Sequence, residues 1–118
     1  MKILVVDDAP YVLKVFQDFL GAFGHEVYEA IDGEEALIKY REIDPDVVLM
    51  DILMPKLDGV NATKEILKIN PLAKIIVITA VGKPGLENDC IMAGAKSFIS
   101  KPFKIKELMN IINSVMEK

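Results

Sequence analysis

Three carboxylates, one hydroxyl and one ammonium group stand at the ends of short apolar or mixed runs of this sequence. They belong to Asp7, Asp8, Asp51, Thr79 and Lys101. Carboxylates that converge in one pocket repel one another unless a hard cation neutralises them. A hydroxyl and an ammonium group can stabilise the oxygens of a phosphoryl group. If the fold brings these five side chains together, they have the chemistry to bind a divalent cation and to receive a phosphoryl group.

The cation that best suits these ligands is Mg²⁺, with Mn²⁺ as a substitute. Mg²⁺ prefers oxygen ligands, keeps several waters, and is typically held by one or two protein carboxylates together with phosphate oxygens. We expect Asp8 and Asp51 to be direct ligands, and Asp7 to act closely or through a water molecule. Zinc is not expected, because the set contains no Cys or His.

Asp51 is the expected nucleophile, because it stands alone at the end of the predicted central strand while Asp7 and Asp8 hold the metal. An acyl phosphate formed on Asp51 needs its non-bridging oxygens neutralised. The metal ion and the Lys101 ammonium would supply positive charge, and the Thr79 hydroxyl would supply a neutral donor.

Apolar runs and helical stretches alternate along the chain. Continuous runs rich in Val and Ile are typical of strands that are covered on both faces, as in a parallel sheet. Gly24 and Gly94 are predicted helix stops, and Asp32 is a predicted helix N-cap. We predict strands near residues 2–6, 26–30, 46–50, 74–79 and 97–100, and helices near residues 10–22, 34–43, 58–69, 85–93 and 104–116.

This alternation predicts an α/β fold, a doubly wound five-stranded parallel sheet with helices on both faces. In such sheets ligands bind beyond the carboxyl ends of the strands, where the polar residues described above are placed. Neighbouring strands lie about 4.8 Å apart, so the ends of adjacent strands can share one pocket.

Length and charge limit the possible functions. A chain of 118 residues with 52% hydrophobic content forms one domain, residues 1–118, and we expect no output domain. The apolar runs are far shorter than the roughly 20 residues of a membrane helix, so we expect a cytoplasmic protein with no membrane insertion. A net charge of −4 argues against direct nucleic-acid binding. The single cysteine, Cys90, cannot form an internal disulfide.

Several motifs resemble the receiver domain of two-component response regulators, the family that includes CheY-like proteins. The resemblance covers the whole chain. The motifs are Leu4-Val5-Val6-Asp7-Asp8, Leu49-Met50-Asp51-Ile52-Leu53-Met54-Pro55, Asp58-Gly59, Ile78-Thr79-Ala80 and Ser100-Lys101-Pro102-Phe103.

The resemblance implies a flavodoxin-like strand order 2-1-3-4-5 and phosphorylation of Asp51 by the phosphohistidine of a sensor histidine kinase. It implies that Asp8, Asp51 and the backbone carbonyl of Leu53 bind Mg²⁺ with help from Asp7, and that Lys101 pairs with the phosphoryl oxygens. The peptide bond before Pro102 is expected to be cis, as it usually is in receivers.

The resemblance also implies a switch, in which Thr79 moves to the phosphoryl group and Phe98 fills the space that Thr79 leaves. Many relatives have tyrosine at the position of Phe98, and an apolar Phe can lie inward without phosphate. Two further positions tune hydrolysis in the family. They hold Leu53 and Val81 here, and neither can orient a water molecule, so we predict a long-lived phosphoryl group. Equal decay rates in the wild type and Leu53→Asn would contradict this.

The first predicted helix has a wider apolar arc than one core contact needs. Its periodicity places Val12, Phe16, Phe19, Leu20 and Phe23 against the sheet. Tyr11 and Val15 fall on the flank, and together with Pro102 and Phe103 they are expected to dock a kinase. By resemblance, residues 84–118 would carry the contacts with a downstream target, and the unphosphorylated protein would be a monomer.

Two other classes fit less well. A phosphohydrolase with an Asp nucleophile would have a second acid two residues later, where this chain has Leu53. A flavin-binding module would have a phosphate loop after the first strand, where Asp7 and Asp8 place negative charge instead. Within the receiver family the sequence leaves open a flagellar motor target, a phosphorelay to a histidine phosphotransfer protein, and feedback on the kinase.

Overall fold

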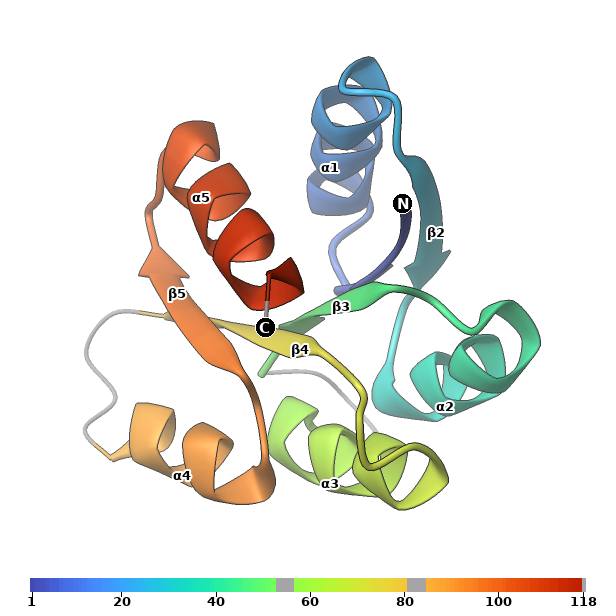
Figure 1. Ribbon diagram of the computed structural model, residues 1–118, viewed down its shortest axis with the longest axis vertical. Coiled ribbons are helices and arrows are strands. Elements are labelled where there is room, and N and C mark those ends of the chain that lie inside the picture. Colours follow the sequence, from blue (N-terminus) through green and yellow to red (C-terminus); the bar gives the residue numbers. More distant parts are fainter. Residues whose placement is uncertain (53–56, 81–84, 118) are drawn as a thin grey trace.

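The computed structural model describes residues 1–52, 57–80 and 85–117 of the chain. Strands and helices alternate throughout, and the predicted order of elements is confirmed (Figure 1). The elements are β1 (Lys2–Val6), α1 (Pro10–Ala22), β2 (Glu26–Ala30), α2 (Gly33–Ile43), β3 (Val47–Asp51), α3 (Gly59–Ile69), β4 (Ile75–Ala80), α4 (Leu86–Ala93), β5 (Ser97–Lys101) and α5 (Ile105–Met116).

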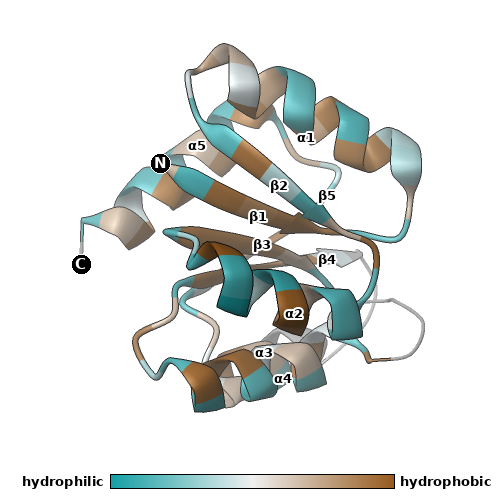
Figure 2. Ribbon diagram, turned by 90° about the vertical axis from the view of Figure 1, so that its right-hand side faces the viewer, coloured by the Kyte–Doolittle hydropathy of each residue, from teal (hydrophilic) through white to brown (hydrophobic). Residues whose placement is uncertain are grey.

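The strands form one parallel sheet of order β2-β1-β3-β4-β5, the flavodoxin-like order that the resemblance implied. Helices α1 and α5 cover one face, and α2, α3 and α4 cover the other (Figure 2). The interior strands β1 and β3 are therefore buried on both sides, as their continuous apolar runs indicated, whereas the edge strands β2 and β5 are partly exposed.

Each face of the sheet has its own core. Alternate residues of a strand point to opposite faces. Ile3, Val5 and Leu49 pack with α1 and α5, whereas Leu4, Val48 and Met50 pack with α2, α3 and α4. The buried Cys90 belongs to the second core.

The helix boundaries follow the predicted caps. The Asp32 side chain accepts a hydrogen bond from the Glu35 amide and begins α2. Asp58 caps α3 in the same way, so that helix begins at Gly59, a residue later than predicted. Gly24 and Gly94 both have positive φ, which glycine adopts without steric cost, and they follow the ends of α1 and α4. No helix in the described ranges is long and apolar enough to cross a membrane.

The predicted orientation of α1 is wrong at two positions. Leu13, Phe16 and Leu20 are the buried residues of this helix, and they repeat at helical spacing. Phe19 and Phe23 are 47% and 59% exposed. Phe19 lies on the flank of α1 that faces the segment between β5 and α5, with Phe103 and Ile105. Phe23 lies beyond the last helical residue.

Candidate functional site

Asp7, Asp8 and Asp51 form an acidic cluster at the carboxyl edge of the sheet. One carboxylate oxygen from each residue lies within 4.8 Å of those of the other two. The pairing of Val6 with Met50 places the ends of β1 and β3 side by side, which brings the acids together. The Asp7 amide donates to the Ala30 carbonyl, and Asp7 Oδ1 accepts from the Ala9 amide at 2.9 Å. The cluster is therefore held by backbone hydrogen bonds and strand pairing.

The electrostatics of the cluster leave negative charge uncompensated. Asp7 is 2% exposed, and its Oδ2 accepts no hydrogen bond from the described residues. Burial, and next the Asp7 carboxylate, raise the pKa of Asp51 to about 6, although Lys101 lowers it in part. A cluster in which the Asp51 carboxyl resists ionisation, and in which Asp7 has a buried oxygen without a donor, is suited to a hard divalent cation.

This cluster fits the predicted Mg²⁺ site in its ligand chemistry. All three side chains offer oxygen atoms, and they come from the residues that the sequence indicated. The predicted contribution of the Leu53 carbonyl lies outside the described residues, as does the predicted effect of Val81 on hydrolysis. Both remain predictions.

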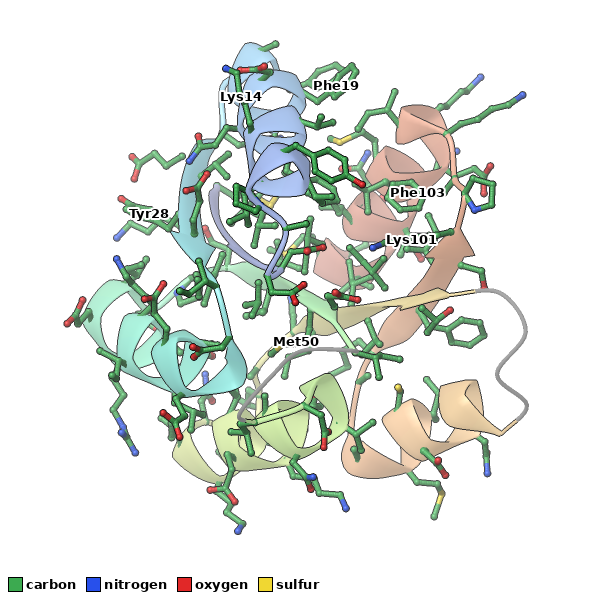
Figure 3. The ribbon with its side chains drawn as sticks, turned by 180° about the vertical axis from the view of Figure 1, so that it is seen from behind. Lys14, Phe19, Tyr28, Met50, Lys101 and Phe103 are labelled. Carbon is green, nitrogen blue, oxygen red and sulfur yellow. The ribbon has the colours of Figure 1, made fainter. Side chains whose placement is uncertain are left out.

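Lys101, the last residue of β5, joins the acidic cluster through its long side chain. Its Nζ lies 3.7 Å from Asp7 Oδ2, and its side chain is 38% exposed. Ile99, two residues earlier, packs in the core with α1 and α5, so Lys101 points to the same face as the acids. The peptide bond between Lys101 and Pro102 is cis, as predicted. Figure 3 shows the Lys101 side chain directed from β5 toward the middle of the molecule.

Thr79 lies at the same edge, but its hydroxyl is directed elsewhere. It is 2% exposed, and its Oγ1 lies 3.2 Å from Ser100 Oγ on β5. Thr79 pairs with Ser100 in the sheet, and Val77 and Phe98 precede them by two residues on the face that α2, α3 and α4 cover. Among the described residues, Thr79 makes no hydrogen bond with Asp51.

Ser100 is the site residue that the sequence reasoning missed. The available signal was its place next to Lys101 at the end of β5, where a parallel register would set it beside Thr79. The proposed switch residue Phe98 is partly buried and packs against the core of the same face. This position agrees with an inward Phe, and whether Phe98 moves stays a prediction.

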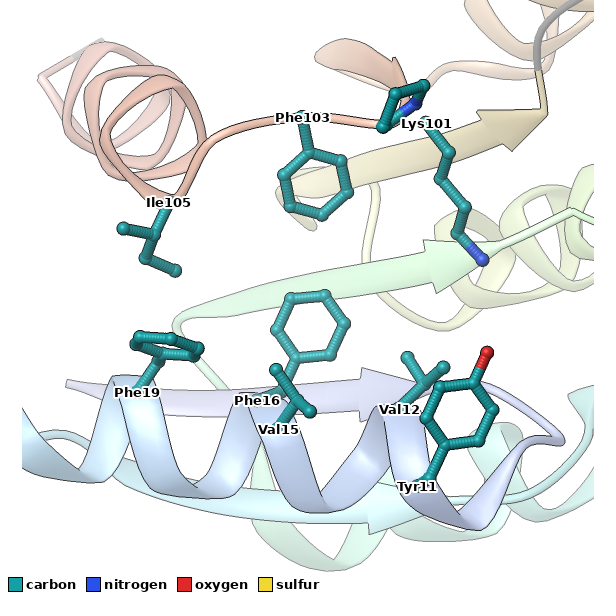
Figure 4. Close-up of a pocket in the computed structure, with 9 residues that line it drawn as sticks. Tyr11, Val12, Val15, Phe16, Phe19, Lys101, Phe103 and Ile105 are labelled. Atoms are coloured by element: carbon teal, nitrogen blue, oxygen red, sulfur yellow. The ribbon is translucent and has the colours of Figure 1, made fainter.

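An apolar groove of 650 Å³ runs between α1 and the segment that joins β5 to α5 (Figure 4). The rings of Phe16 and Phe103 stack across it, with centroids 6.3 Å apart. Lys101 stands at the end of the groove near Tyr11 (Figure 4). The four predicted docking residues all line this groove, whose full lining is Tyr11, Val12, Val15, Phe16, Phe19, Lys101, Pro102, Phe103 and Ile105.

Comparisons with known proteins find relatives of one kind. The model of the response regulator receiver domain matches residues 3–113. The chemotaxis protein CheY of Thermotoga maritima is 45% identical over 97% of this chain and 96% of its own length. CheY of Bacillus subtilis is 44% identical over 98% of this chain and 97% of its own length.

Solved structures are also similar. CheY of Borrelia burgdorferi, solved in a complex with CheX, BeF3 and Mg²⁺, has a TM-score of 0.93 and 36% identity, and the match covers 100% of this chain and 90% of that one. A putative response regulator from Chloroflexus aurantiacus also has a TM-score of 0.93, with 29% identity over 99% of this chain and 98% of that one.

Proposed function

This chain belongs to the family of response regulator receiver domains, and on that basis we propose that Asp51 accepts a phosphoryl group from the phosphohistidine of a sensor histidine kinase. The domain is the receiver of a two-component response regulator and not a classical enzyme. The observation that carries the proposal is the convergence of Asp51 with two further acids and Lys101 at one edge of the sheet.

The proposed reaction transfers the phosphoryl group between two protein side chains. A carboxylate oxygen of Asp51 attacks phosphorus, and the electron pair of the breaking phosphorus–nitrogen bond goes to the imidazole nitrogen. The ring, protonated on its other nitrogen by solvent, leaves as a neutral imidazole. Asp51 must be ionised to attack, and with a pKa of about 6 its carboxyl is mostly ionised at neutral pH. The product is an acyl phosphate on Asp51.

The neighbouring side chains have separate tasks in this proposal. Asp8 and Asp51 would hold Mg²⁺, with Asp7 beside them. The bound ion would supply positive charge next to the phosphoryl oxygens. Lys101, whose ammonium already lies at the acidic cluster, would pair with a phosphoryl oxygen. Thr79 would turn toward the phosphoryl group after transfer, and Phe98 would respond to that movement.

The apolar groove is the proposed docking site for the kinase. Tyr11 and Val15 are 75% and 46% exposed on α1, and Pro102 and Phe103 form the opposite wall. An apolar surface beside the phosphorylated residue suits a helix that carries the donor histidine. We propose that the partner binds here and presents its phosphohistidine to Asp51.

For the output, we propose a chemotaxis-type regulator that acts by protein contact in the cytoplasm. The support is the group of CheY relatives that match nearly their whole length. The residues from α4 to α5 would contact the downstream target. The alternative from the sequence is a relay that passes the phosphoryl group to a histidine phosphotransfer protein.

The decisive experiment is mass spectrometry of the intact protein after incubation with acetyl phosphate and Mg²⁺. We expect the wild type to gain one phosphoryl group, about 80 Da. This gain should be absent when a chelator removes Mg²⁺ and absent in Asp51→Asn. Asp18→Asn, at an exposed position on α1, is the control and should gain the same mass. An unchanged adduct in Asp51→Asn, or no adduct in a wild type that binds Mg²⁺, would contradict the proposal.

A further inference from the structure

The Thr79 hydroxyl is held on the opposite face of the sheet from the carboxylate that it would serve. Asp51 pairs with Ile78 and follows Leu49 by two residues, and both neighbours pack in the core with α1 and α5. Thr79 is the next residue after Ile78, and successive side chains of a strand point to opposite faces of the sheet. In the phosphate-free protein the Thr79 side chain therefore points to the face that α2, α3 and α4 cover. Its side chain must therefore rotate around the end of β4 to reach a phosphoryl group on Asp51.

A specific contact opposes this rotation. Thr79 Oγ1 and Ser100 Oγ lie 3.2 Å apart, within hydrogen-bond distance, and the two residues are paired in the register of β4 and β5. Thr79 is 2% exposed, so its hydroxyl has little access to water. A buried hydroxyl that loses its hydrogen-bond partner cannot replace it with water, which costs free energy. The contact between Thr79 and Ser100 should therefore stabilise this orientation more than an exposed pair would.

We propose that Ser100 is a positioning residue that holds Thr79 in the phosphate-free orientation and sets the free-energy cost of the switch. The proposal rests on the proposed function, because it assumes that Thr79 moves to a phosphoryl group on Asp51. The Ser100 and phosphoryl oxygens then compete for one hydroxyl. A chain without a hydroxyl at position 100 should release Thr79 more easily and be phosphorylated faster.

The size of the effect follows from one hydrogen bond between neutral groups. Loss of the competing bond should accelerate phosphorylation by about two- to tenfold. Ser100 has other interactions as well, so a single substitution cannot isolate the contact with Thr79. A double-mutant cycle separates the pair from the other contributions of either residue.

The test uses Ser100→Val and Ser100→Thr, which have the same shape but differ in the hydroxyl. Each is made in the wild type and in Thr79→Val. The first readout is the χ1 angle of Thr79 in the phosphate-free protein, measured by three-bond NMR couplings to its methyl carbon. We expect a single rotamer with Ser100→Thr and averaged couplings with Ser100→Val. The second readout is the phosphorylation rate with acetyl phosphate and Mg²⁺.

The rate should be higher in Ser100→Val than in Ser100→Thr by about two- to tenfold, and equal in the two when Thr79 is Val. A single Thr79 rotamer in both proteins, or a rate difference that survives in Thr79→Val, would overturn the role of Ser100. If the wild type gains no phosphate, the proposed function fails, and the NMR couplings still decide whether Ser100 positions Thr79.

Discussion

Lys101 Nζ lies 3.7 Å from Asp7 Oδ2, a buried oxygen that accepts no hydrogen bond from the rest of the described chain. The two residues come from β5 and from the end of β1, which are separated in the sheet by β3 and β4. The lysine side chain therefore reaches across two strands to place its charge among the acids. This relationship links the electrostatics of Asp51 to a residue at the far edge of the sheet.

Lys101→Met should raise the pKa of Asp51 above its value of about 6, because the lysine charge lowers it in the wild type. The Lys101 side chain is 38% exposed, so water screens its ion pair with Asp7. Lys101→Met should therefore lower the free energy of unfolding by less than about 1 kcal/mol. The titration of the Asp51 carboxyl carbon by NMR measures the pKa. Lys104→Met, at an exposed position near α5, is the control and should leave the Asp51 titration unchanged. An Asp51 pKa that does not rise in Lys101→Met would show that this lysine does not act on the cluster.

Asp51→Asn should stabilise the metal-free protein at neutral pH. The folded chain holds the Asp51 proton up to a pKa of about 6, whereas the ordinary value is 3.8. The folded state therefore binds more protons in this window, and the unfolding free energy falls as pH rises from about 4 to about 6. Above that window the wild type should be less stable than Asp51→Asn by about 1–2 kcal/mol, after allowance for solvent screening.

Urea denaturation in the presence of a chelator, at several pH values across this window, measures the difference. The two proteins should converge at the acid end. Glu42→Gln, an exposed position on α2, controls for the loss of one negative charge. A stability difference between wild type and Asp51→Asn that does not depend on pH would contradict the raised pKa.

Gly59→Ala should disturb the phosphorylation site through the backbone. A Cβ at this position would collide with the Asp51 carbonyl oxygen and lie 2.7 Å from the Ile52 Cα. The Gly59 amide also donates to the Ile52 carbonyl at 2.9 Å, so α3 is fixed closely against the end of β3. We expect a loss of about 1–3 kcal/mol in unfolding free energy and weaker Mg²⁺ binding.

Gly21→Ala is the matched control, because no atom lies within 4 Å of its added Cβ. This helical position should gain about 0.5–1 kcal/mol. Denaturant unfolding and a Mg²⁺ titration compare the two variants. If Gly59→Ala retained wild-type stability and Mg²⁺ affinity, the close approach of α3 would have no bearing on the site.

Val15→Ser should slow phosphorylation by the kinase but leave phosphorylation by acetyl phosphate unchanged. The side chain lines the apolar groove and is 46% exposed, so the substitution removes surface available to a partner while sparing the core. We expect the rate of transfer from a phosphorylated kinase to fall by about fivefold. Lys14→Ser changes the neighbouring exposed residue of α1, which does not line the groove, and should keep the wild-type rate. If the phosphorylation rate fell equally with the kinase and with acetyl phosphate, Val15 would support the structure of the phosphorylation site and would have no specific role in kinase docking.

Much of this fold could be predicted from local features of the sequence. Runs such as residues 3–6 and 47–50 have the continuous apolar character of strands buried on both faces, and both became central strands. Asp32 was recognisable as an N-cap because a short carboxylate side chain before an acidic first helical turn can accept a hydrogen bond from a free amide of that turn. These features depend on interactions between residues close in the sequence, so the chain alone contains them.

The location of the acidic cluster was also predictable, since carboxyl ends of parallel strands meet at one edge of the sheet. The exposure of Phe19 and Phe23 was not predictable in the same way. A helix with a broad apolar arc offers several faces to a sheet, and contacts from distant segments select the face that becomes buried.

The same limit applies to the details of the site. Thr79 stands at the right strand end, yet only the pairing of β4 with β5 and the packing of both faces direct its hydroxyl to Ser100. The raised pKa of Asp51 likewise depends on burial and on charges that lie far away in the sequence. Local residue types and periodicity were enough to indicate the elements and the acids. The neighbour that each polar group meets depends on how the strands and helices pack together.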